Sequence, residues 1–197
     1  TLCHPDGTRK VTGGTNAAGV TTALAVSSGM TFKDGTKEAS VTLEMGHIFA
    51  KKLLQAGYDV LLIRDGEDVQ LDNVARTVLA NNKADAHIAL HWDATEKDKG
   101  AFFMSVPDSL KRMEPVASHW ESHEKLGESL ISGLKGKGVK IFSKGSMDMD
   151  LTQTSYSTVP SVDIELGDKV SDHSEKQLNL LGDALVDGVN KYYGFAS

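Results

Sequence analysis

This chain of 197 residues has only one cysteine, no excess of positive charge and no long apolar run. Its single cysteine, Cys3, excludes an internal disulfide and any zinc site built from several cysteines. The net charge of −6 argues against nucleic acid as a partner, because binding phosphates requires a basic surface. No apolar run is long enough to span a membrane. What remains, with 40% hydrophobic and 24% charged residues, is typical of a globular protein with an ordinary core.

The length suits one domain with a sizeable core, and no linker, repeat or low-complexity tract divides the chain. We therefore expect a single domain over residues 1–197, and we expect a monomer. The chain opens on Thr1 without an initiator Met, and no signal peptide is visible. We expect a mature or excised fragment from which a targeting segment has been removed.

Strand and helix patterns alternate along the chain, which predicts an α/β fold with a mostly parallel, twisted sheet flanked by helices on both faces. A long loop rich in small residues, with room for a short hairpin at residues 24–32, is expected over residues 12–35. Apolar runs predict strands at residues 1–4, 58–63, 86–91, 100–106, 139–142 and 160–166. Apolar residues at helical spacing predict helices at residues 36–56, 71–82, 109–134 (with a break near Pro115) and 171–193.

The segment AHIALHWDA, residues 86–94, is the part of the chain around which a site is expected. Its centre is a short apolar strand, and in α/β sheets the carboxyl ends of the strands carry the functional groups. Because side chains alternate along a strand, His91 and Asp93 share one face and Trp92 lies on the other. A single His at a strand end is more often structural than a ligand, so the interpretation depends on what other segments bring to it.

Three more ionisable residues are predicted at the same sheet edge. His4 ends the first strand, Glu38 opens the first long helix, and Glu165 ends a late strand in which it shares a face with Asp163, opposite Val162 and Ile164. Taken singly, Glu38 is explained by the helix dipole and Glu165 by capping of the next turn. Together, two His and one Glu form a known catalytic zinc set, and a further carboxylate can take a proton from water.

These residues stand in motifs that resemble those of the amidase-3 family of zinc-dependent N-acetylmuramoyl-L-alanine amidases, which cut peptidoglycan. The family's strand-end Gly-His-Gly-Gly motif is matched in reduced form by Cys3-His4-Pro5-Asp6-Gly7, with GGTNAAG at residues 13–19. Its helix-start Glu corresponds to Glu38. Its Arg, Ala-Asn, Ala-Asp and Ser-X-His-Ala-Asn run resembles RTVLANNKADAHIALHWDA at residues 76–94, and its Pro-Ala-Val-Leu-Val-Glu-Leu-Gly motif resembles PSVDIELG at residues 160–167.

The resemblance implies a catalytic domain that hydrolyses the amide bond between the lactyl group of N-acetylmuramic acid and L-alanine of the stem peptide. It implies that His4, Glu38 and His91 bind Zn²⁺ and that Glu165 is the catalytic acid/base. Zinc would lower the pKa of a bound water to about 7, and Glu165 would move its proton to the leaving nitrogen. Peptidoglycan is then the partner, and the protein is expected to be secreted or associated with the bacterial cell wall as an autolysin.

Two further residues are candidate substrate contacts. Arg76 could bind a substrate carboxylate with two hydrogen bonds, although a surface ion pair on a helix explains it equally well. Asp93 could shape the groove or hold the His91 ring, whereas Trp92 is more simply core packing.

The remaining histidines are assigned to structure. His119 and His123 lie one helical turn apart without the His-Glu-X-X-His pattern, so a solvated helix face is expected. His47 and His87 are expected to be structural, and His173 is expected to lie at the surface. The acidic segment Met147-Asp148-Met149-Asp150 lacks the number and spacing of ligands that a calcium site requires. Two other functions stay open: a zinc peptidase that cuts within the stem peptide, and a wall-binding relative without catalysis.

Overall fold

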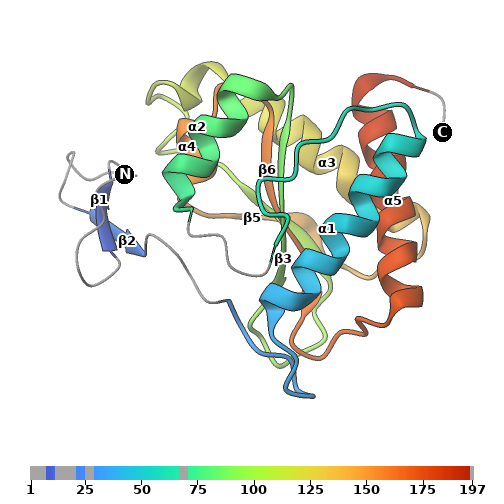
Figure 1. The fold of residues 1–197 in the computed structure, drawn as a ribbon. Helices are drawn as coiled ribbons and strands as arrows, with labels where there is room; N and C mark the ends of the chain where they lie inside the picture. Colours follow the sequence, from blue (N-terminus) through green and yellow to red (C-terminus); the bar gives the residue numbers. More distant parts are fainter. Residues whose placement is uncertain (1–7, 12–20, 25–28, 67–70, 196–197) are drawn as a thin grey trace.

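The computed structural model describes residues 8–11, 21–24, 29–66 and 71–195, which form a four-stranded sheet, a two-stranded hairpin and the surrounding helices (Figure 1). The hairpin pairs β1 (Thr8–Val11) with β2 (Thr21–Leu24) in antiparallel fashion. The predicted strand at residues 1–4, and His4 with it, lies outside the described residues. So does much of the predicted loop at residues 12–35.

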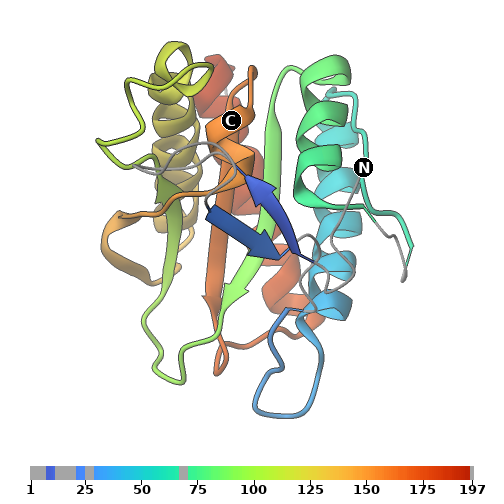
Figure 2. The ribbon, with the colours of Figure 1, turned by 90° about the vertical axis from the view of Figure 1, so that its left-hand side faces the viewer.

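The main sheet has the strand order β3-β6-β4-β5 (Figure 2). Its members are β3 (His87–Asp93), β4 (Ala101–Ser105), β5 (Ile141–Asp148) and β6 (Ser161–Asp168). β3 pairs with β6 and β4 pairs with β5 in parallel, whereas β4 and β6 are antiparallel. Two of the three pairings are therefore parallel, which confirms the predicted α/β class with a mostly parallel sheet.

One face of this sheet packs against three long helices and carries the main core. These helices are α1 (Glu38–Gln55), α3 (Trp120–Gly136) and α5 (Glu175–Tyr193). Val162, Ile164 and Leu166 alternate along β6 and point into this core, where Trp92 and Met45 are also buried. Apolar residues at every second strand position meet apolar residues at helical spacing, and burying this surface stabilises the layered arrangement.

The opposite face of the sheet is covered at one end by two shorter helices, α2 (Asn73–Lys83) and α4 (Thr152–Tyr156) (Figure 1). Asp72 caps α2, because its side chain accepts a hydrogen bond from the Ala75 N–H. The Asn81 side chain links α2 to the end of α4 through two hydrogen bonds. Its Nδ2 donates to Tyr156 O, and its Oδ1 accepts from the Thr158 N–H. Helices therefore lie on both faces, as predicted.

The structure corrects several local predictions. Residues 58–63 form no strand: Leu61 is 49% exposed, and the Tyr58 hydroxyl donates to Asn190 of α5. The apolar run there packs partly against α5 and pairs with no described strand, so its composition alone was misleading. The long helix predicted at residues 109–134 is divided into turns, a short 3₁₀ helix (Val116–Ser118) after Pro115, and α3. The sequence interpretation missed α4, and β5 begins two residues later and ends six residues later than predicted.

Candidate active site

The carboxyl ends of β3 and β6 bring His91 and Glu165 together. The two residues are direct partners in the parallel register of these strands. Partners in neighbouring strands point to the same face, so both side chains lie on the face opposite the main core. The start of α1 lies at the same end of the sheet (Figure 1), which brings Glu38 to this edge. Three of the residues predicted from the sequence therefore share one sheet edge.

Glu38 is buried, with 6% of the residue exposed, and its carboxylate is held by hydrogen bonds from two different segments. Oε2 accepts from the Met30 N–H at 2.7 Å, and Oε1 accepts from the Trp92 N–H at 3.2 Å. Oε1 also lies 3.1 Å from His91 Nδ1. Burial disfavours the charged form, yet these hydrogen bonds outweigh it and lower the pKa of Glu38 below its ordinary value. Glu38 is thus an oriented, ionised carboxylate.

Gly29 makes room for this carboxylate. Its φ angle of +74° suits glycine, and a Cβ atom there would lie 2.7 Å from Glu38 Oε2. The approach of the backbone at residues 29–30 is what allows the Met30 N–H to reach Glu38.

His91 lies between carboxylates. Its Nδ1 faces Glu38, and its Nε2 lies 3.5 Å from Asp163 Oδ2. Burial opposes protonation of the ring, but the charge of Asp163 and the hydrogen bond with Glu38 prevail and raise the pKa of His91 to about 9. The side chain nevertheless keeps 45% of its surface exposed, so a ligand has access to it.

Glu165 is buried, with 9% of the residue exposed, and its Oε2 has no hydrogen-bond partner among the described residues. Burial raises the pKa of Glu165 to about 8, although His91 acts in the opposite direction. Val162 and Ile164 point into the core, as predicted for a strand in which Glu165 turns to the other face. A carboxyl group in this setting can hold or release a proton near neutral pH.

The residues suggested for substrate contact have partners within the protein. The Arg76 Nε donates to Leu71 O at 2.9 Å, and the side chain is only partly exposed. Asp93 forms an ion pair with Lys99, whose Nζ also lies 4.3 Å from the centre of the Phe102 ring. Their roles in substrate binding stay predictions. Trp92, 2% exposed, packs against Phe32 in the core, which agrees with the simpler interpretation of that residue.

The donor set fits a zinc ion at Glu38 and His91. Ligand atoms about 2.0–2.1 Å from a tetrahedral zinc lie about 3.3 Å apart, close to the 3.1 Å between Glu38 Oε1 and His91 Nδ1. Within the described ranges no Lys or Arg pairs with Glu38, Asp163 or Glu165, and His91 is the cationic group that faces Glu38 and Asp163 there. Over the same ranges no group of three potential ligands has metal-binding geometry. The third predicted ligand, His4, lies outside them.

Two functional or structural roles escaped the sequence analysis. Asp163 was placed on the face of Glu165 but was given no role, although period-two alternation was signal enough to include it in the site. His123 was expected on a solvated face, which is wrong: it is 2% exposed. Its Nδ1 accepts from the Ser161 N–H at 3.0 Å, and its Nε2 donates to Thr154 O at 3.2 Å, so it joins α3 to α4 and β6.

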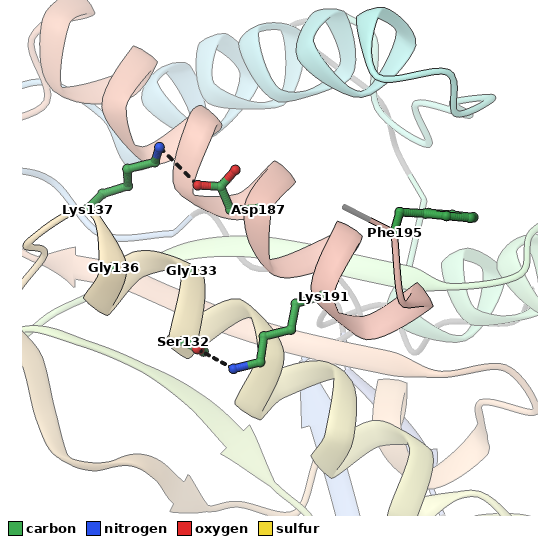
Figure 3. Close-up of a pocket in the computed structure, with 7 residues that line it drawn as sticks. All are labelled: Ser132, Gly133, Gly136, Lys137, Asp187, Lys191 and Phe195. Atoms are coloured by element: carbon green, nitrogen blue, oxygen red, sulfur yellow. Dashed lines mark hydrogen bonds and ion pairs between the residues drawn. The ribbon is translucent and has the colours of Figure 1, made fainter. Parts of the chain in front are cut away.

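A pocket of about 390 Å³ lies elsewhere, between α3 and α5 (Figure 3). The cations that line it already have partners: Lys137 pairs with Asp187 at 3.0 Å, and Lys191 donates to Ser132 at 2.7 Å. None of the predicted site residues lines it. The ionisable residues of the candidate active site therefore lie at the sheet edge and not in this pocket.

Comparison with solved structures shows the same fold in several amidases. The N-acetylmuramyl-L-alanine amidase Ami1 from Mycobacterium smegmatis matches with a TM-score of 0.74 at 18% identity, covering 88% of this chain and 84% of that one. Ami1 from Mycobacterium abscessus, in its apo form, matches with a TM-score of 0.70 at 18% identity over 88% and 86% of the two chains. The amidase AmiC2 of Nostoc punctiforme matches with a TM-score of 0.68 at 21% identity over 85% and 90%. A search of curated protein sequences found no match.

The chain thus shares its α/β fold with these amidases, and its acid-rich site lies at the carboxyl ends of parallel strands, where α/β sheets carry their functional groups. The family model described as N-acetylmuramoyl-L-alanine amidase matches residues 13–187, and the chain belongs to this amidase-3 family. It is thus an amidase that acts on peptidoglycan. Over the described residues, every helix is too short or too polar to cross a bilayer.

Proposed function

We propose that this amidase depends on zinc and hydrolyses the amide bond between the lactyl group of N-acetylmuramic acid and L-alanine. The observation that carries the proposal is the convergence of Glu38, His91 and Glu165 at one sheet edge of a chain that belongs to this family. Glu38 and His91 would hold the ion, together with His4. Bound zinc would supply a Lewis acid that acidifies water and polarises the amide carbonyl.

Residues of the chain itself orient the Glu38 carboxylate and transfer the proton. The Met30 and Trp92 N–H groups keep the Glu38 carboxylate in a fixed orientation. Glu165 accepts a proton from the attacking water and delivers it to the L-alanine nitrogen. The water oxygen bonds to the carbonyl carbon, the carbon–nitrogen bond breaks, and the nitrogen, which has gained one proton from Glu165, leaves as a neutral amine. The second water proton stays on the new lactyl carboxyl group, which then releases it to solvent. Glu165 ends the cycle in the state in which it began.

The setting of the reaction is part of the proposal. We propose that the enzyme is secreted or associated with the bacterial cell wall and acts as an autolysin, because peptidoglycan lies outside the cell membrane. We propose a single catalytic domain over residues 1–197 that works as a monomer, with Arg76 and Asp93 in reach of the stem peptide.

Two measurements on the purified chain test this function. Zinc content by atomic absorption is expected near one ion per chain. Digestion of purified muropeptides is expected to release stem peptides with a free L-alanine amino terminus and to leave muramic acid intact. Cleavage inside the stem peptide would indicate a zinc peptidase instead. Wall binding without zinc and without new amino termini would indicate a non-catalytic relative, and either result would refute the proposal.

A further inference from the structure

Asp163 occupies an unusual place for a carboxylate. Its neighbours in β6, Val162 and Ile164, are almost completely buried, and its own side chain is only 15% exposed. Burying a carboxylate is unfavourable unless a partner compensates its charge. The corresponding position in the family motif described above is a leucine, which would be the simple choice for a partly buried strand. A compensating interaction is therefore to be expected for Asp163.

That interaction is made with His91. Asp163 Oδ2 lies 3.5 Å from His91 Nε2, and over the described part of the chain no Lys or Arg forms an ion pair with Asp163. At this distance the two groups form an ion pair, with the oxygen slightly beyond the usual range of a hydrogen bond. The burial of Asp163 also raises its pKa, and the charge on His91 acts against that rise.

The two nitrogens of His91 thus face two different carboxylates, Glu38 on the Nδ1 side and Asp163 on the Nε2 side. A neutral imidazole has one protonated and one unprotonated nitrogen, and a metal binds the unprotonated one. If Glu38 and His91 share an ion, Nδ1 must be unprotonated, so the proton must lie on Nε2. Nε2 is the nitrogen next to Asp163.

We propose that Asp163 is a positioning residue: it accepts the Nε2–H of His91, fixes the ring in the tautomer that leaves Nδ1 free, and so strengthens zinc binding by Glu38 and His91. The inference rests on the proposed zinc site and adds to it a residue that acts through His91. Carboxylates that hold a ligating histidine in this way contribute 10–100-fold to metal affinity in other proteins.

Three variants test the role of Asp163. Asp163→Leu removes the acceptor and inserts the residue of the family motif, whereas Asp163→Asn keeps a carbonyl oxygen that can accept the Nε2–H. Glu124→Gln is the matched control, because Glu124 is a partly buried acid that accepts hydrogen bonds from Ser105 and Val106. The carboxyl end of β4, which carries Ser105, lies at the other end of the sheet, since β4 is antiparallel to β6.

The measurement is the zinc dissociation constant, obtained by competition with a coloured chelator. We expect Asp163→Leu to weaken zinc binding by about 10–100-fold, Asp163→Asn to weaken it by less than about tenfold, and Glu124→Gln to leave it unchanged. Thermal unfolding of the metal-free variants checks the fold. Asp163→Leu should unfold no earlier than the wild type, because it removes a partly buried charge.

A second readout is independent of affinity and activity. In the zinc-loaded wild type, ¹H–¹⁵N correlation spectra of the His91 ring should show a protonated Nε2 and a metal-bound Nδ1. Wild-type zinc affinity in Asp163→Leu, or a metal-bound Nε2, would overturn the positioning role while leaving the zinc enzyme intact. A wild-type chain that binds no zinc would overturn the proposed function as well.

Discussion

Replacing Glu165 by glutamine tests the assignment of the catalytic acid/base with little change in shape. Glutamine fills nearly the same volume, and Glu165 Oε2 has no hydrogen-bond partner among the described residues that the change would break. The variant cannot accept the water proton. We expect turnover to fall by about 10²–10⁴, equivalent to about 3–5 kcal/mol in the activation free energy.

The same substitution should not destabilise the metal-free protein at neutral pH. Burial raises the pKa of Glu165 from its ordinary value of 4.5 to about 8. Below pH 4.5 the carboxyl group is neutral in both the folded and the unfolded state, so its contribution to stability is fully present. As the pH rises from 4.5 towards 8, the carboxyl group ionises in the unfolded state but stays protonated in the folded state. Ionisation lowers the free energy of the unfolded state, so the free energy of unfolding decreases. The loss is at most about 5 kcal/mol, and glutamine avoids it.

The assay combines three measurements on Glu165→Gln and on the Glu124→Gln control: amidase turnover, zinc content, and urea unfolding of the metal-free forms at pH 5 and pH 8. We expect Glu165→Gln to retain zinc, to lose turnover, and to lose less stability between the two pH values than the wild type loses. Wild-type turnover with zinc bound would show that Glu165 is not the base. Loss of zinc would show that Glu165 is a ligand, and the roles of Glu165 and Glu38 would then be reversed.

The other predictions concern the metal ligands and the fold. Glu38→Ala should lose both zinc and turnover while the domain stays folded; zinc content and circular dichroism check this, and full zinc occupancy would remove Glu38 from the ligand set. Gly29→Ala should weaken zinc binding because its Cβ would meet the Glu38 carboxylate, whereas Gly35→Ala, also at positive φ (+91°) but with open space around it, should not; equal zinc affinities in the two variants would contradict this reasoning. Burial lowers the pKa of His123 from 6.5 to about 4, so the unfolded state takes up a proton first as the pH falls between these values, and stability drops by at most about 3 kcal/mol. His123→Gln should be less stable than the wild type at pH 7 but lose less stability by pH 4.5 in urea unfolding, and parallel losses would show that His123 is not the group responsible.

Much of the site was predictable because it depends on local periodicity. The alternation in residues 160–167 is enough to place Glu165 opposite Val162 and Ile164, and the structure confirms this. The amphipathic pattern that follows Glu38 predicts a helix with the carboxylate in its first turn, where α1 indeed begins. Such features are set by residues a few positions apart, so the chain carries the signal within each segment.

Which distant segments pair and contact one another was decided only by tertiary packing. Nothing in the sequence states that β6 lies between β3 and β4, yet this order makes His91 the register partner of Glu165 and brings Asp163 beside the same ring. Burial is a property of the assembled layers as well: His123 has the spacing of a solvated helix face, but α4 and β6 enclose it. The apolar residues 58–63 look like a buried strand until the structure shows that they have no pairing partner among the described strands. Periodicity determines which face a side chain takes, and packing between segments determines what that face meets.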